Sequence, residues 1–336
     1  MIKKILVMAV FSMALACKIQ KNKPISEANV EEYGSTITAA ELKDHLYTFA
    51  SDEFQGRDTG KPGQKKAANY LKDNYMKMEI ASPLGGEDYF QDIPSSFFNN
   101  KYNDSENVVA FIKGSEFPEE IIVISAHYDH VGVDAEGNIY NGADDDGSGT
   151  VSILEIAEAF KEAQDEGYQP RRSILFLHVT GEEKGLLGSD YYTKNPIFPL
   201  ENTVTDLNTD MIGRIDPKHE DNPNYIYLIG SDKLSTQLHE LSEEVNNKYT
   251  QFDLDYTYND ENDPNRFYYR SDHYNFAKHN IPVIFYFNGT HADYHQPTDT
   301  PDKIEYDLMA RRAQLIFYTA WEVANRDERL VVDKAQ

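Results

Sequence analysis

The stretch RRSILFLHVTGEE, residues 171–183, joins a strand pattern to a pair of acidic residues. Residues 174–179 are almost entirely apolar, which is typical of a strand that is buried on both faces of a parallel sheet. Glu182 and Glu183 follow this strand after a single glycine. Because ligand sites of α/β sheets form where the strands end, the stretch predicts a central strand with site residues directly beyond it.

Similar apolar segments occur on both sides of this stretch and alternate with helical patterns. The strand patterns lie in EEIIVISAHYDH (119–130), TVTDLNTDMIG (203–213) and IPVIFYFNGT (281–290), and the helical patterns include GSGTVSILEIAEAFKEA (147–163) and DLMARRAQLIFYTAWEVAN (307–325). Alternation of this kind predicts a single α/β domain with a mixed, mainly parallel central sheet and helices on both of its faces.

The N-terminus reads as an export signal. In MIKKILVMAVFSMALAC, residues 1–17, two lysines precede an apolar run that is too short to span a bilayer. We expect a signal peptide over residues 1–16. The segment ALAC resembles a bacterial lipobox, so we expect a lipid on Cys17 and a protein anchored to a bacterial membrane, facing the periplasm or the exterior; ordinary cleavage near Ala16 is the alternative.

Domain boundaries follow from composition. Residues 17–37 are polar and lack apolar periodicity, so they are predicted to form a lipid-anchor tether, and residues 38–330 the folded domain. The formal net charge of −25 argues against nucleic acid as a partner. The chain has a single cysteine, so it can form no internal disulfide.

Each predicted strand is followed by titratable or metal-ligating side chains. These residues are His127, Asp129, Asp145, Glu182, Glu183, Asp210, Tyr294 and His295. Two Zn²⁺ ions would balance three carboxylates, Asp145, Glu183 and Asp210, together with one bridging hydroxide. Neutral histidines complete a nitrogen and oxygen ligand set that suits zinc. The sequence therefore predicts two zinc ions per chain.

Individual residues of this set have distinct expected roles. Asp145 lies in NGADDDGSGT (141–150), where three adjacent carboxylates indicate either a solvated loop or a cation site. Asp129 follows His127 by two residues, so its carboxylate is expected to accept from the second ring nitrogen of that histidine. Glu182 and Glu183 should point in different directions, one as a metal ligand and the other as a base.

Other chemistries fit less well. A calcium loop that places Asp144 at its third position would need a ligand at Ile153, its twelfth. The chain contains neither the G-x-S-x-G motif of a serine hydrolase nor the H-E-x-x-H motif of many zinc peptidases.

The motifs SAHYDHVG, NGADDDGSGT, TGEEKGLLGS, LNTDMIG, RSDHYNFAKHNIPVIFY and DYHQPTDTPDKI resemble, in this order, those of the secreted co-catalytic di-zinc aminopeptidase family. That family includes glutamate carboxypeptidase-like enzymes and glutaminyl cyclases. The similarity extends over roughly residues 45–320.

The resemblance implies a role for each matching residue. It implies that His127 and Asp210 hold one zinc ion, that Glu183 and His295 hold the other, and that Asp145 bridges them. It also implies that the Asp145–Asp146 peptide is cis, with Asp144 and Asp146 as hydrogen-bonded or solvated neighbours. The implied general base is Glu182, the residue that polarises the carbonyl is Tyr294, and Arg270 contacts substrate.

The expected activity is hydrolysis of the N-terminal peptide bond of peptides by a metal-bridging water that Glu182 activates. The expected partners are peptides with a free N-terminus, and a membrane is contacted only through the lipid on Cys17. A carboxypeptidase and a glutaminyl cyclase remain alternatives. A non-catalytic scaffold is disfavoured, because the base and all five ligands are present.

Overall fold

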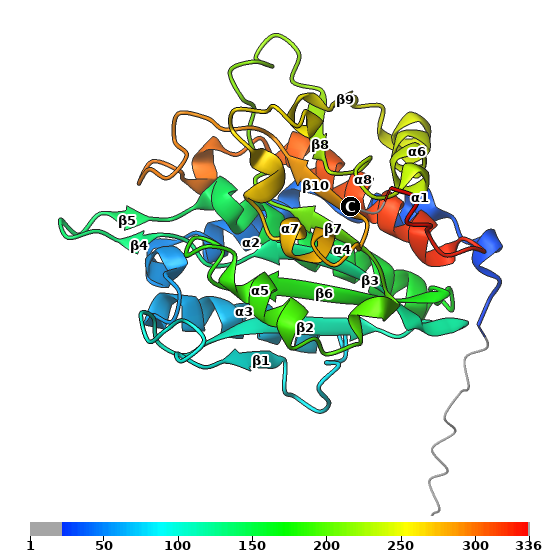
Figure 1. Ribbon diagram of the computed structural model, residues 1–336, viewed down its shortest axis with the longest axis horizontal. Helices are drawn as coiled ribbons and strands as arrows, with labels where there is room; N and C mark the ends of the chain where they lie inside the picture. The colour runs from blue at the N-terminus through cyan, green and yellow to red at the C-terminus, as the bar shows by residue number, and fades with distance from the viewer. Residues whose placement is uncertain (1–21, 335–336) are drawn as a thin grey trace, which may run out of the picture.

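The computed structural model describes residues 22–334, which form one α/β domain around an eight-stranded sheet (Figure 1). The strand order is β1-β2-β6-β3-β7-β10-β8-β9. The strands are β1 (Phe90–Ile93), β2 (Ser105–Ile112), β3 (Phe117–His127), β6 (Arg172–Val179), β7 (Thr203–Thr209), β8 (Tyr225–Ile229), β9 (Asp253–Asp255) and β10 (Val283–Phe287). A separate hairpin pairs β4 (Gly132–Val133) with β5 (Ile139–Tyr140).

The centre of the sheet is parallel and its margins are mixed. Strands β6, β3, β7 and β10 run parallel to one another, whereas β1, β2 and β8 pair antiparallel with a neighbour. Every residue of β6 and β7 is buried, as the apolar run at 174–179 predicts. The predicted mixed, mainly parallel sheet is therefore confirmed.

Helices cover both faces of the sheet, but unequally. One apolar core includes residues of α1 (Val30–Gly34), α2 (Ala39–Phe49), α3 (Pro62–Lys77), α4 (Gly149–Asp165), α6 (Thr236–Val245) and α8 (Tyr306–Asn325). A second core, on the opposite face, includes residues of α5 (Leu187–Lys194) and α7 (His273–Ala277). Alternate residues of the central strands enter the two cores, because successive side chains of a strand point to opposite faces.

The predicted tether is partly wrong, because its later residues belong to the domain. The Tyr33 ring stacks on Trp321 of α8, and its hydroxyl donates to Glu166 at 2.6 Å. Ile37 is 1% exposed. The few apolar residues of this segment pack against α8, which lies almost three hundred residues further along the chain, so no local periodicity reveals them. The predicted signal peptide, Cys17 and the first part of the tether lie outside the described residues.

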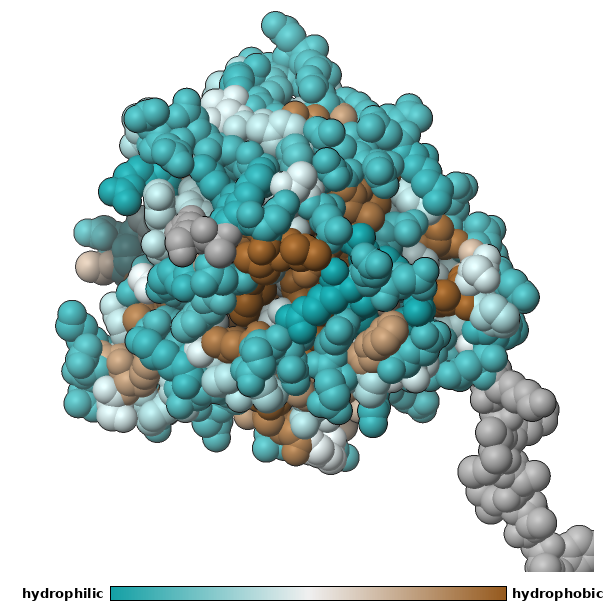
Figure 2. Space-filling view, turned by 45° about the vertical axis from the view of Figure 1, so that its right-hand side comes forward, coloured by the Kyte–Doolittle hydropathy of each residue, from teal (hydrophilic) through white to brown (hydrophobic). Residues whose placement is uncertain are grey.

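The surface is mainly polar. Figure 2 shows a face that is mostly hydrophilic, with smaller hydrophobic groups near its middle, in agreement with the mean hydropathy of −0.63. Within residues 22–334, no helix combines the length and apolar character that a membrane span requires.

Candidate active site

The predicted site residues meet at one edge of the sheet, beyond the carboxyl ends of its parallel strands. His127 is the last residue of β3, Glu182 and Glu183 follow β6, and Asp210 follows β7. His295 lies in the loop after β10. Asp145 lies in the turn Ala143–Ser148 that leads into α4. Parallel strands that end at the same edge bring these distant segments together.

One group of ligand atoms surrounds Nε2 of His127. This nitrogen lies 3.2 Å from Oδ1 of Asp145 and 3.6 Å from Oδ1 of Asp210. Donors about 2.0–2.2 Å from a tetrahedral zinc ion lie roughly 3.3–3.6 Å from one another. Nε2 of His127 is buried and, within the described residues, has no hydrogen-bond partner. An unsatisfied buried nitrogen at this spacing from two carboxylates fits a zinc ligand.

A second group forms around the other oxygen of Asp145. Oδ2 of Asp145 lies 2.9 Å from Nε2 of His295, and that nitrogen lies 3.2 Å from Oε2 of Glu183. The two oxygens of Asp145 therefore face two different sets of donors. This arrangement fits a carboxylate that bridges two metal ions, which explains why the central residue of the triplet Asp144–Asp146 is an aspartate.

Sequence reasoning missed one residue of the second group, His130. Its Nδ1 lies 2.8 Å from Oε1 of Glu183 and 3.9 Å from Oδ2 of Asp145. His130, Asp145 and Glu183 form a set of donor atoms that all lie within 4.8 Å of one another, as do His127, Asp145 and Asp210. The available signal was the second histidine of AHYDH, three residues after His127.

The remaining aspartates of the triplet support Asp145. Oδ1 of Asp144 accepts from the Gly213 amide at 2.7 Å, and Oδ1 of Asp146 accepts from the Met211 amide at 3.0 Å. Both residues are 0% exposed, so they are hydrogen-bonded supports and not solvated neighbours. The Asp145–Asp146 peptide is cis, as the resemblance implies.

Two further side chains hold the backbone of this turn. The Asp299 carboxylate accepts from the amides of Asp144 and Asp145, at 3.0 and 3.2 Å. The buried Arg57 guanidinium donates to the carbonyls of Asn141 and Gly142, at 2.6 and 2.8 Å. The turn that carries the bridging carboxylate is thus fixed from both sides.

The expected contact between His127 and the Asp129 carboxylate differs in the structure. Nδ1 of His127 pairs with the main-chain carbonyl of Asp129 at 3.1 Å, while the nearer carboxylate oxygen is 3.8 Å away. That carboxylate accepts from the Thr59 hydroxyl at 2.8 Å and from the Glu182 amide at 3.1 Å. Strand β3 ends at His127, so the chain turns there and brings the main-chain carbonyl of Asp129 next to Nδ1 of His127. Asp129 therefore orients the backbone of Glu182.

The adjacent glutamates lie in different electrostatic environments. Burial raises the pKa of the Glu182 carboxyl well above its usual range in the metal-free protein, and the nearby Asp210 and Glu183 carboxylates add to this effect against His127. Burial and Asp145 also oppose ionisation of Glu183, but His130 and His295 outweigh them and lower its pKa to about 2. The environment of Glu183 thus favours its ionised form, while that of Glu182 favours its protonated form more than solvent would.

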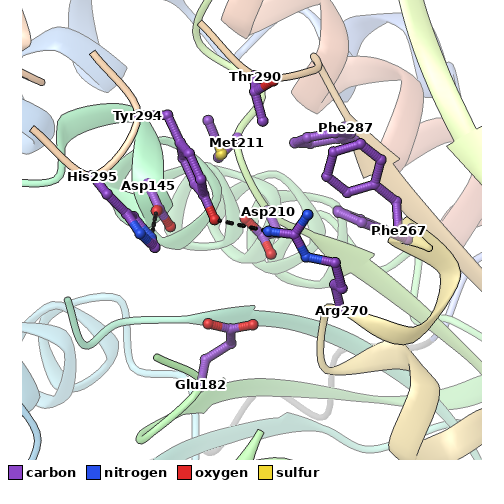
Figure 3. Close-up of a pocket in the computed structure, with 11 residues that line it drawn as sticks. Asp145, Glu182, Asp210, Met211, Phe267, Arg270, Phe287, Thr290, Tyr294 and His295 are labelled. Atoms are coloured by element: carbon purple, nitrogen blue, oxygen red, sulfur yellow. Dashed lines mark hydrogen bonds and ion pairs between the residues drawn. The ribbon is translucent and has the colours of Figure 1, made fainter. Parts of the chain in front are cut away.

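A pocket opens beside these groups (Figure 3). In Figure 3 the Glu182 carboxylate faces it from the side opposite Tyr294 and His295. The apolar part of its wall is formed by Met211, Phe267, Phe285 and Phe287. Arg270 also lines it, and its Nη2 donates to the Tyr294 hydroxyl at 3.4 Å. The pocket can hold an apolar side chain next to the metal-ligating groups.

Comparisons with known proteins find a family match over the part of the chain that carries this site. The model of Peptidase family M28 matches residues 107–320. Leupeptin-inactivating enzyme 1 of Streptomyces exfoliatus is 30% identical over 262 residues, a match that covers 77% of this chain and 50% of that protein. The chain thus spans about half the length of the curated relatives it matches.

Solved structures share the fold. LapB from Legionella pneumophila has a TM-score of 0.71 at 23% identity, and covers 90% of this chain and 77% of its own. BSAP, a zinc aminopeptidase from Bacillus subtilis, has a TM-score of 0.67 at 15% identity, and covers 89% of this chain and 99% of its own.

Proposed function

Because the chain belongs to Peptidase family M28, we propose that it is a zinc-dependent aminopeptidase that removes the first residue of peptides. The observation that carries the proposal is the pair of donor groups that share Asp145. Beside them lies Glu182, a carboxylate outside both groups, and an apolar pocket opens at the same place. A protein that only binds zinc would not need a free buried carboxylate at this point.

We propose two zinc ions per chain. His127 and Asp210 would hold one ion, Glu183 and His295 the other, and Asp145 would bridge them, in keeping with the separations between their donor atoms. Bound zinc supplies positive charge that polarises a carbonyl group and lowers the pKa of water.

Two protein side chains would carry the proton transfers and the charge. Glu182 takes the proton of the attacking water and later delivers it to the leaving amine, a role that suits a buried carboxylate with a raised pKa. Tyr294 would donate a hydrogen bond to the oxygen of the scissile carbonyl as negative charge develops there. Burial raises the pKa of the Tyr294 hydroxyl, so it keeps its proton and remains a donor.

The pocket defines the substrate. Its phenylalanine side chains and Met211 would take an apolar first side chain. The carboxylates of Glu182 and Asp210 lie on the same pocket and would attract the free α-ammonium group of the peptide. We therefore expect a preference for peptides that begin with leucine or a similar residue.

Arg270 supports the main alternative, a carboxypeptidase. A guanidinium in the substrate pocket can pair with a terminal carboxylate. The aminopeptidase is favoured because Glu182, on the same pocket, is a carboxylate outside both donor groups and can accept from a free α-ammonium group. A glutaminyl cyclase on the same fold is the third possibility.

The test compares three substrates with the zinc-loaded enzyme: leucine amide, an N-acetylated dileucine and a peptide that begins with glutamine. We expect rapid hydrolysis of leucine amide, none of the blocked dipeptide, and no cyclised product. Enzyme treated with a chelator is the control and should be inactive until zinc is restored. Cleavage of the blocked dipeptide in preference to the amide would establish the carboxypeptidase, and accumulation of the cyclised product would establish the cyclase.

We also propose that the mature protein is exported and carries a lipid on Cys17. The support is the apolar run that ends at this cysteine behind two lysines. Cys17→Ser should release the protein from the membrane fraction of a bacterial host and abolish labelling with a fatty-acid analogue. A variant that stays membrane-bound and is processed at the same bond would refute the lipid anchor.

A further inference from the structure

His130 is buried beside Glu183 and Asp145, and its ring nitrogens lack hydrogen bonds among the described residues. It is 0% exposed, and within residues 22–334 neither ring nitrogen has a hydrogen-bond partner. The ring packs closely on Gly142, where an added Cβ atom would lie only 2.5 Å from two of the ring carbons. A buried polar group without a partner is costly, so such a group in a native protein calls for an explanation.

The ring nitrogen Nδ1 points into the metal-ligating groups. It is 2.8 Å from Oε1 of Glu183, close enough for a hydrogen bond, yet the two atoms are not aligned for one and both remain unsatisfied. Nε2 of His127 is in the same situation: 3.2 Å from an Asp145 oxygen and also without a hydrogen bond. Oδ2 of Asp145 is a fourth buried atom of this kind at the site.

His127 belongs to the first donor group, whereas the atoms of His130, Asp145 and Glu183 lie in one group of donors within 4.8 Å of one another, so one cation among these three residues would satisfy all three. We propose that His130 is a ligand, through Nδ1, of the zinc ion held between Asp145 and Glu183. This inference rests on the proposed two-zinc centre and adds a donor to it. The added donor comes from the buried side of the site, whereas the His295 side chain is 37% exposed.

The alternative is that His130 only positions Glu183. Removal of a residue that orients a ligand weakens metal binding by roughly 10–100-fold, so a loss of affinity alone does not separate the two roles. A substitution that offers a different donor atom does. Nδ1 is the ring nitrogen nearer to the main chain, and zinc–sulfur bonds of about 2.3 Å are only slightly longer than zinc–nitrogen bonds of about 2.0–2.1 Å, so a cysteine at this position can reach the same ion.

The experiment measures metal binding by the whole protein with His130→Asn, His130→Cys and a control, His273→Asn. His273 is also 0% exposed with both nitrogens unsatisfied among the described residues, but its ring packs against Phe285 and Tyr268. Zinc affinity is measured by competition with a chromogenic chelator, and the cobalt-substituted forms are compared by absorption spectroscopy.

We expect His130→Asn to lower the affinity for one of the two zinc ions by on the order of 100-fold or more. The absorption spectrum of the cobalt-substituted variant should also differ from that of the parent. His273→Asn should bind both ions as the parent does. Cobalt-loaded His130→Cys should show a thiolate-to-cobalt charge-transfer band that the parent lacks.

Other outcomes separate the two proposals. A parent protein that binds a single ion overturns the two-zinc centre, and this inference with it. If the parent binds two ions and His130→Asn binds both with unchanged affinity, only the role of His130 is wrong. Weakened zinc in His130→Asn, combined with no charge-transfer band in His130→Cys, would make His130 a positioning residue and overturn its assignment as a ligand.

Discussion

The two sides of the site are built differently. One side, here called the metal wall, consists of His127, Asp145, Glu183 and Asp210, with side chains 1%, 4%, 5% and 11% exposed. The other, the substrate rim, consists of Arg270, Tyr294 and His295 on loops, where the His295 side chain is 37% exposed. The residues of the metal wall lie at or just beyond buried strand ends and in the turn Ala143–Ser148. Within the rim, Arg270 donates to the Tyr294 hydroxyl at 3.4 Å, and the Tyr294 ring stacks on that of His295 with 4.0 Å between their centroids.

Because of this difference, we expect metal binding to depend on one side of the site and substrate choice mainly on the other. Residues of the wall are held by several buried contacts each, so a change there should alter metal binding or folding. Arg270 and Tyr294 hold no metal in the proposed centre, so a change of either should alter the choice and affinity of substrate while the metals stay, whereas a change of His295, a proposed zinc ligand, should also weaken zinc binding. Variants on each side therefore test whether metal binding and substrate choice are separate.

The largest effect is expected for Asp145→Ala. Its two oxygens face both groups of donors, so the variant should lose both zinc ions and all measurable activity. Elemental analysis of the dialysed protein is the measurement. If one ion were retained at full occupancy, Asp145 would not be the bridge.

A smaller effect is expected for Asp144→Asn. Oδ1 of Asp144 accepts from the amide of Gly213, while Oδ2 accepts from Asn288 and lies 3.0 Å from Nε2 of His291. Asparagine would replace one of these acceptor oxygens with an NH2 donor that faces donating groups, so we expect the free energy of unfolding to fall by about 1–3 kcal/mol. Both zinc ions should remain.

Denaturation in urea measures this loss, and Asp302→Asn, at an exposed aspartate, is the control that should be neutral. Loss of a zinc ion from folded Asp144→Asn would contradict the expectation that Asp144 stabilises the turn without affecting metal binding.

The smallest effect is expected for Arg270→Ala. Arg270 is exposed, so its interaction with substrate is screened and worth about 0.5–1 kcal/mol, which corresponds to a two- to five-fold fall in kcat/KM. The fall should be larger for dipeptides, whose carboxylate lies within reach, than for leucine amide. Zinc content should not change. Equal losses for both kinds of substrate would remove Arg270 from substrate binding.

The sequence allows prediction of the wall better than of its supports. Parallel strands end at one edge by topology, so His127, Glu183 and Asp210 can be brought together from strand patterns alone. His130 lies beyond the end of β3, where the direction of a side chain depends on how the chain turns. The same turn places the carbonyl of Asp129, and not its carboxylate, against His127.

Contacts between distant segments explain the other differences. Tyr33 and Ile37 are isolated apolar residues in a polar stretch, and tertiary contacts such as those of Tyr33 with Trp321 and Glu166 show that this stretch belongs to the domain. Asp299, which holds the amides of Asp144 and Asp145, comes from a loop about 150 residues away. No local pattern indicates such a partner.

The central claim is that Glu182 transfers protons beside the two zinc ions without being a ligand of either. Native mass spectrometry and kcat, measured together on Glu182→Gln and Glu183→Gln, test it most directly. We predict that Glu182→Gln keeps two zinc ions and loses roughly 10²–10⁴-fold in kcat, whereas Glu183→Gln loses zinc. Full turnover in Glu182→Gln, or loss of zinc from it, would contradict the account.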